Sequence, residues 1–164
     1  MLNATQIQEK PQSFELDQSI RELDLRRIMW KMADSEEGGG YAKETLEEAE
    51  TGYRRFLQLH LLFPGMEIVP TKMIDKVWHQ HILDTKAYSR DCQEIFGSFL
   101  HHYPYFGMNG EEDQENLQRC FEKTQEAWVG VFGEPMFERE AVRCGGHACH
   151  APSSCACRSP GACK

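Results

Sequence analysis

The chain has 164 residues, of which 40% are hydrophobic and 27% are charged, and its formal net charge is −8. This length and composition predict one globular domain with a hydrophobic core of its own. No apolar run approaches the roughly 20 residues that a membrane-spanning helix needs, and the polar start of the chain does not resemble a secretory signal peptide. We therefore expect a cytoplasmic protein with no membrane partner. The acidic balance argues against a nucleic-acid partner held by bulk charge.

Apolar side chains at helical spacing predict that residues 13–143 form a helical domain, after a disordered N-terminus over residues 1–12. The first helix is expected within residues 13–34, where the apolar positions recur every three or four residues (Ile20, Leu23, Ile28 and Met29, with Trp30). The second is expected over residues 41–62, where a helical apolar stripe follows an acidic first half (Tyr53, Phe56, Leu57, His60 and Leu61).

Further helices are expected over residues 72–88, 89–100 and 111–129, and the first two of these are either separate or continuous. A short helical turn is expected over residues 137–142. Glycine and proline predict irregular connections at residues 38–40 and 101–110. Since no stretch alternates apolar and polar residues as a half-buried strand does, the predicted fold class is all-α, a bundle of about five helices.

The last 21 residues, 144–164, differ from the rest in composition. They have no large apolar side chain that would bury a core, so we predict a flexible tail. Five of the seven cysteines of the chain lie there, together with two histidines (Cys144, His147, Cys149, His150, Cys155, Cys157 and Cys163).

Thiolates and imidazoles together favour zinc, and thiolates favour cuprous copper, so the tail is predicted to bind zinc or copper. The absence of a C-x2-C pair means that it is not a standard zinc finger. Two alternatives stay open. One is a redox-active or disulfide-linked tail. The other is a peptide that an enzyme modifies while the helical domain docks onto a protein partner.

His79 and His81 stand two residues apart in the predicted helix over residues 72–88. Such positions point to nearly opposite sides of a regular helix, so the two imidazoles are not expected to hold one metal ion from that helix. His81 shares its face with apolar residues and is either a buried, hydrogen-bonded core residue or a ligand. His79 has Asp75 four residues before it, which indicates an oriented ligand or general base, or an ordinary helix pair.

His101 and His102 follow the predicted helix over residues 89–100. If that helix folds back on the one before it, either side chain can approach His79 or His81. Two or three imidazoles with Asp75, Asp84 or Cys92 would form a zinc or iron site that keeps an open position. Alternatively, His101 and His102 cap the C-terminus of the preceding helix.

The string Asp75-x-x-Trp78-His79-x-His81-x-Leu83-x-x-x-x-Tyr88-x-x-Asp91-Cys92-x-x-x-x-Gly97 resembles the signature of the glycine-rich domain-containing protein-like family, formerly a domain of unknown function. That family includes plant glycine-rich domain proteins and short bacterial proteins. The resemblance implies a helical domain. It assigns no role to the seven positions that it marks, which are Trp78, His79, His81, Tyr88, Asp91, Cys92 and Gly97.

These observations predict a protein that binds or handles metal ions, zinc or copper, with ligands among the tail residues and His79, His81, His101 and His102. One alternative is a metal-dependent enzyme centred on His79 and His81. The other is a partner-docking domain whose tail is a modification substrate. The sequence leaves open whether there is any catalysis.

Overall fold

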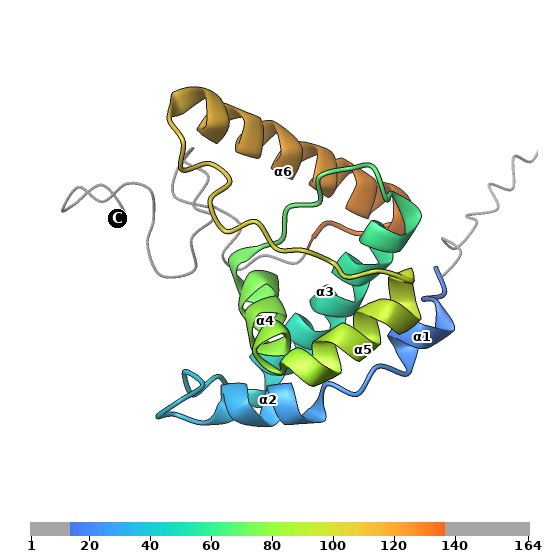
Figure 1. Cartoon of the computed structure of the whole chain (residues 1–164), viewed down its shortest axis with the longest axis vertical. Coiled ribbons are helices and arrows are strands. Elements are labelled where there is room, and N and C mark those ends of the chain that lie inside the picture. Colours follow the sequence, from blue (N-terminus) through green and yellow to red (C-terminus); the bar gives the residue numbers. More distant parts are fainter. Residues whose placement is uncertain (1–13, 137–164) are drawn as a thin grey trace, which may run out of the picture.

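A computed structural model of the chain describes residues 14–136 (Figure 1). The predicted Cys-rich tail, the N-terminal segment over residues 1–12 and the helical turn over residues 137–142 lie outside the described residues. Within them there are helices and loops and no strand, which confirms the all-α prediction. None of these helices is long and apolar enough to cross a membrane.

The described residues form six helices, five of which have eight residues or more, in agreement with the predicted number. In chain order they are α1 (Gln18–Arg21), α2 (Arg26–Ala33), α3 (Lys43–Leu62), α4 (Lys72–Leu83), α5 (Thr85–Phe96) and α6 (Glu111–Phe132).

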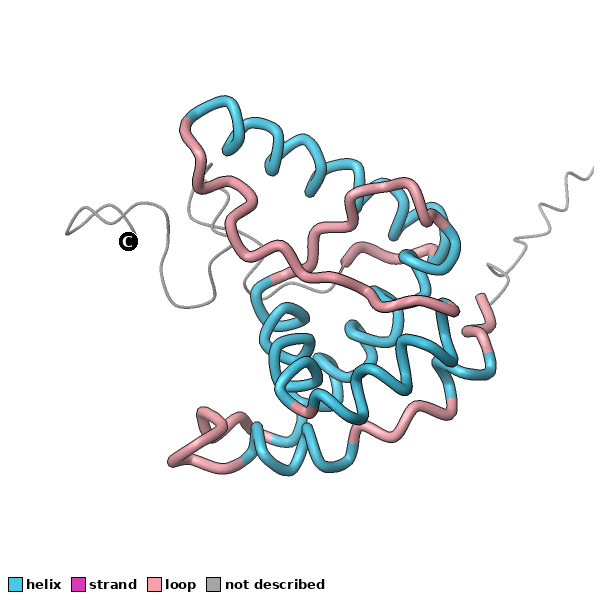
Figure 2. Tube along the Cα trace, in the orientation of Figure 1, coloured by secondary structure: helices cyan, strands magenta, loops and turns pink. Residues whose placement is uncertain are grey.

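Helix α3 lies at the centre of the fold, in contact with α1, α2 and α4, and α5 packs on α4 and α1 (Figure 1). Helix α6 lies across the end of the molecule away from α2 (Figure 1). Two loops, residues 63–71 and 97–110, run between it and the other helices (Figure 2). The first loop is tied to α6 because the Val69 N–H donates to Thr124 Oγ1 over 3.0 Å.

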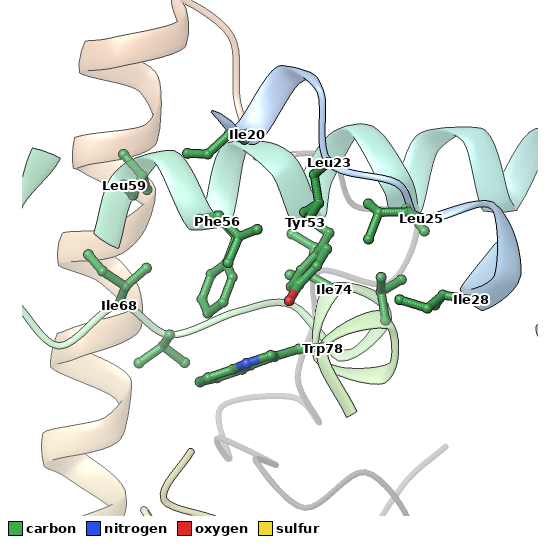
Figure 3. Close-up of a cluster of buried hydrophobic side chains, with 14 of the residues drawn as sticks. Ile20, Leu23, Leu25, Ile28, Tyr53, Phe56, Leu59, Ile68, Ile74 and Trp78 are labelled. Carbon is green, nitrogen blue, oxygen red and sulfur yellow. The ribbon is translucent and has the colours of Figure 1, made fainter. Parts of the chain in front are cut away.

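The core forms where α3 faces α4. Tyr53 and Phe56 of α3 point toward Ile74 and Trp78 of α4 (Figure 3). Phe56 and Tyr53 are fully buried, and the ring centroids of Phe56 and Trp78 lie 4.9 Å apart. This packing confirms the apolar stripe predicted for α3. Since aromatic rings remove large apolar areas from water, this contact stabilises the fold.

The prediction of one helix within residues 13–34 is wrong, because the structure has two short helices there. The Asp17 carboxylate accepts from the Ser19 N–H at the start of α1, and Asp24 accepts from the Arg26 N–H at the start of α2. Between them the chain turns so that Leu23 and Leu25 are both buried. The Arg54 guanidinium of α3 donates to the carbonyls of Ile20 and Leu23, at the break between the two helices.

Trp30 was expected in the apolar stripe of the first helix, but its side chain is 76% exposed. Ile28 and Met32, four residues apart in α2, face the core. Because Trp30 lies two residues from each of them, it points to the opposite side of the helix, toward solvent.

The other helix boundaries also differ from the predictions. The break between α4 and α5 falls at Asp84, whose carboxylate accepts from the Ala87 N–H and so begins α5. Helix α6 continues through Gly130 to Phe132 and ends at Gly133, whose φ of 72° is left-handed. A glycine inside a helix costs about 1 kcal/mol relative to alanine, which is too little to end a helix that buries Leu117, Phe121 and Trp128.

His60 lies in the last turn of α3 between aromatic rings, with centroids 4.6 Å from Phe56 and 6.1 Å from Trp78. Its Nε2 atom is buried and has no hydrogen-bond partner among the described residues. Burial lowers the pKa of His60 to about 4, since the charged imidazole would lose its hydration. His60 is therefore neutral in the folded protein at pH 7.

Replacing Trp78 by alanine is expected to lower the free energy of unfolding by about 3 to 5 kcal/mol, because the buried ring is lost from the core. Urea denaturation followed by far-UV circular dichroism measures this change. The matched control is Trp30→Ala, which removes an exposed ring and is expected to change stability by less than about 0.5 kcal/mol. An unfolding midpoint of Trp78→Ala close to that of the wild type would contradict the packing.

The lowered pKa of the buried His60 predicts that the folded protein loses stability in acid. The unfolded chain binds a proton at His60 near pH 6.5, whereas the folded protein does so only near pH 4. The stabilisation is therefore complete above pH 6.5 and decreases as the pH falls to 4, by on the order of 3 kcal/mol. Urea denaturation at pH 7 and pH 4 should show a smaller loss for His60→Leu than for the wild type. The exposed control His101→Leu should behave as the wild type does.

Candidate functional site

Three potential metal ligands come together where α4 meets the loop after α5. Asp75, His79 and His102 each offer one ligand atom, and these atoms all lie within 4.8 Å of one another. We refer to these three residues as the Asp75 group. The His102 Nε2 atom lies 3.0 Å from Asp75 Oδ1, and His79 Nδ1 lies 3.6 Å from Asp75 Oδ2. The two imidazole centroids are 4.5 Å apart.

Helix α4 supplies two members of the group through its own geometry. The Thr71 hydroxyl accepts from the Ile74 N–H and begins the helix, which places Asp75 in the first turn. His79 follows four residues later and therefore lies on the same face as Asp75. The pairing of Asp75 with His79 that the sequence predicted is present in the structure.

His102 reaches the group because the loop after α5 is anchored two residues earlier. Trp78 Nε1–H donates to the Tyr88 hydroxyl over 2.8 Å, and the Tyr88 O–H donates to the Leu100 carbonyl. This chain of hydrogen bonds crosses from α4 through α5 to the loop. The His102 ring then packs on the Trp78 ring, with centroids 4.3 Å apart. The fold-back expected for His101 or His102 thus brings in His102.

The Asp75 group is mostly withdrawn from water. The side chain of Asp75 is 1% exposed and that of His102 is 7% exposed, whereas His79 remains 27% exposed. Burial lowers the pKa of His79, and the Asp75 carboxylate partly offsets this effect. A neutral imidazole has a free nitrogen lone pair, so His79 can act as a ligand at pH 7.

The dimensions of the group suit a transition-metal ion. Ligand atoms at zinc distances of about 2.0 to 2.1 Å in a tetrahedron are separated from each other by roughly 3.3 Å. The observed separations of 3.0 and 3.6 Å join the two imidazoles to different oxygens of the Asp75 carboxylate, and one ligand atom from each of the three residues lies within 4.8 Å of the other two. Side-chain rotations would therefore have to draw the three ligand atoms together to centre an ion. Three protein ligands would leave one position of a tetrahedron open.

His81, two residues from His79, belongs to a different buried network made of Tyr53, His81 and Asp91. His81 Nε2 lies 3.1 Å from Asp91 Oδ2, and His81 Nδ1 lies 2.9 Å from the Tyr53 hydroxyl. Since a carboxylate accepts, Nε2–H donates to Asp91 and Nδ1 accepts from Tyr53. Burial lowers the pKa of His81, in keeping with this neutral form. The imidazole has no free lone pair for a metal ion in this arrangement.

The remaining candidates lie apart from the Asp75 group. Helix α5 ends at Phe96 with the left-handed Gly97, before His101 and His102, so neither histidine caps it. His101 is exposed and its ring contacts Phe99. Asp84 caps α5, and Cys92 is buried, with burial raising the pKa of its thiol. The candidate ligands of the tail, Cys144 to Cys163 with His147 and His150, lie outside the described residues.

The sequence pattern did not reveal which histidine of the pair 101–102 joins the group, nor that Tyr88 positions it. The sequence did contain one indication of the role of Tyr88. Trp78 and Tyr88 each carry a polar atom that needs a hydrogen-bond partner when the ring is buried. The choice of His102 depends on the path of the loop, which local periodicity does not encode.

Comparison with known proteins places the helical part of the chain in a family. Glycine-rich domain-containing protein 1 of Arabidopsis thaliana is 29% identical over 104 residues, which make up 61% of this chain and 12% of that protein. The chain thus spans about an eighth of the length of this curated relative. No solved structure matches. The UCP032817-like family matches residues 16–128, more than half of the chain and all of the Asp75 group, and the chain therefore belongs to the UCP032817-like family.

Proposed function

We propose that the protein binds a transition-metal ion through Asp75, His79 and His102. The observation that carries this proposal is the convergence of two imidazoles on one buried carboxylate within 4.8 Å. An isolated buried carboxylate is costly, and a bound metal ion would compensate its charge. A nitrogen that binds an ion carries no proton, so on binding the ion His102 would hold its proton on Nδ1 and offer the lone pair of Nε2.

Zinc suits this donor set better than copper does. Two nitrogen donors and one oxygen donor are typical of zinc sites that keep an open position, whereas thiolates favour cuprous copper. Copper therefore remains a proposal for the tail, whose cysteines would capture a soft ion and deliver it. A protein partner that docks on the helical domain while the tail is modified is the other proposal for these residues.

A metal-dependent enzyme is the second candidate, and the composition of the Asp75 group favours it. Three protein ligands leave room for a water molecule or a substrate, and a bound metal ion lowers the pKa of such a water. Two histidines with one carboxylate also form the ligand set of non-haem iron oxygenases. The proposed centre is His79 with His102, in place of His79 with His81.

Elemental analysis of the full-length protein, purified without chelator or affinity metal, tests the proposed site. The wild type is expected to hold one zinc ion at the Asp75 group, besides any metal in the tail, and His79→Ala and His102→Gln should each lose that ion. His101→Ala, which changes the neighbouring exposed imidazole, is the matched control and should keep it. Circular dichroism verifies that each variant is folded. Equal metal content in His102→Gln and the wild type would mean that the two imidazoles only hydrogen-bond to the buried Asp75 carboxylate and do not bind a metal ion.

The tail is tested separately by replacing its five cysteines with serine in the full-length chain. A protein that handles metal through the tail should lose all bound metal beyond the one ion at the Asp75 group. An enzyme should keep that single ion unchanged in the cysteine variant. Cobalt substitution distinguishes the two sites, because thiolate ligands give intense charge-transfer absorption that imidazole and carboxylate ligands do not.

A further inference from the structure

A surface pocket of about 340 Å³ adjoins the Asp75 group on the other side of His79. Its walls come from α4, from the loop between α2 and α3, and from Met32 of α2. Lys76, His79 and Gln80 lie on the α4 side, and Glu37, Gly38, Gly39 and Tyr41 lie on the loop side. We call it the Lys76 pocket. His79 is the side chain that the pocket and the Asp75 group share.

The loop wall of the pocket has a shape that only glycine permits. A Cβ atom on Gly38 would lie 1.7 Å from the Lys31 carbonyl oxygen, and one on Gly39 would lie 2.8 Å from the Tyr41 ring. The N–H groups of Gly38 and Gly40 both donate to the Asp34 carbonyl, which closes the loop. The glycine run therefore holds the Tyr41 ring against α4, beside Lys76.

Lys76 brings an uncompensated positive charge into this pocket. Its ammonium donates to the Tyr41 hydroxyl over 2.6 Å and lies 5.1 Å from the centroid of that ring. It forms no ion pair with a carboxylate anywhere in residues 14–136. The acidic side chain of the pocket, Glu37, lies 3.5 Å from the Lys31 ammonium, which offsets its charge.

These groups are suited to an anion with several oxygen atoms. The Lys76 ammonium has three N–H donors, of which Tyr41 takes one, and the Tyr41 hydroxyl keeps its own O–H for donation. The Gln80 side chain can offer an amide N–H from the next position on the pocket wall. A metal ion at the Asp75 group would add a second positive charge across His79.

We propose that the Lys76 pocket binds a small oxyanion, a carboxylate or a tetrahedral anion, through Lys76 and Tyr41 next to the metal ion. This inference rests on the proposed metal site and names the ligand class that the site would take. Lys76 and Tyr41 are its binding residues, and His79 orients the metal toward the pocket.

The test is a titration of the full-length protein with sodium acetate and with sodium sulfate, followed by the amide signals of an NMR spectrum. In the zinc-loaded wild type, the signals of residues 38–41 and Gln80 are expected to shift in a saturable way. Lys76→Met should weaken the binding by about tenfold or more, because it removes the charged donor. Lys86→Met, which removes an exposed lysine of α5, is the matched control and should bind as the wild type does.

The outcomes separate this inference from the metal site. The inference is correct if Lys76→Met keeps its zinc but loses anion binding. If only acetate or only sulfate is bound, the result identifies the ligand as a carboxylate or as a tetrahedral anion. It is overturned if Lys76→Met and Lys86→Met bind both anions equally, even when zinc content is normal. If zinc is absent from the wild type, the proposed metal site fails. If anion binding still depends on Lys76 in that case, the Lys76 pocket is an anion site that does not need the metal ion.

Discussion

The chain of hydrogen bonds from Trp78 through Tyr88 to the Leu100 carbonyl is the constraint on which the site depends. It joins α4, α5 and the loop after α5, and it does so inside the core, where an unpaired donor would be costly. Burial raises the pKa of Tyr88, so its hydroxyl remains protonated and can donate to the carbonyl. Because Leu100 is fixed, His102 lies on the Trp78 ring beside Asp75.

Helix α4 places its two histidines in different roles. His81 faces the core, where Tyr53 and Asp91 engage both of its ring nitrogens. His79 faces away and is half-buried at the edge of a pocket. The 100° turn per residue of an α-helix makes this division unavoidable for positions two apart.

Much of the fold followed from local patterns, and the failures have identifiable physical causes. The stripe on α3 and the loop over residues 101–110 were predictable from periodicity and glycine content. The split of the first helix was not, because Arg54 of α3 donates to the carbonyls at that break from 34 and 31 positions away in the sequence. Trp30 was misplaced because the shorter helix rotates it toward solvent.

The sequence by itself determined the all-α class, the pairing of Asp75 with His79 and the separation of His79 from His81. These depend on helical periodicity, which is a property of neighbouring residues. Only the tertiary structure decided that His102, and not His101, completes the Asp75 group, and that a glycine-walled pocket brings Lys76 beside it. Those choices depend on where loops run after distant side chains have paired, and the spacing of residues along one helix does not contain that information.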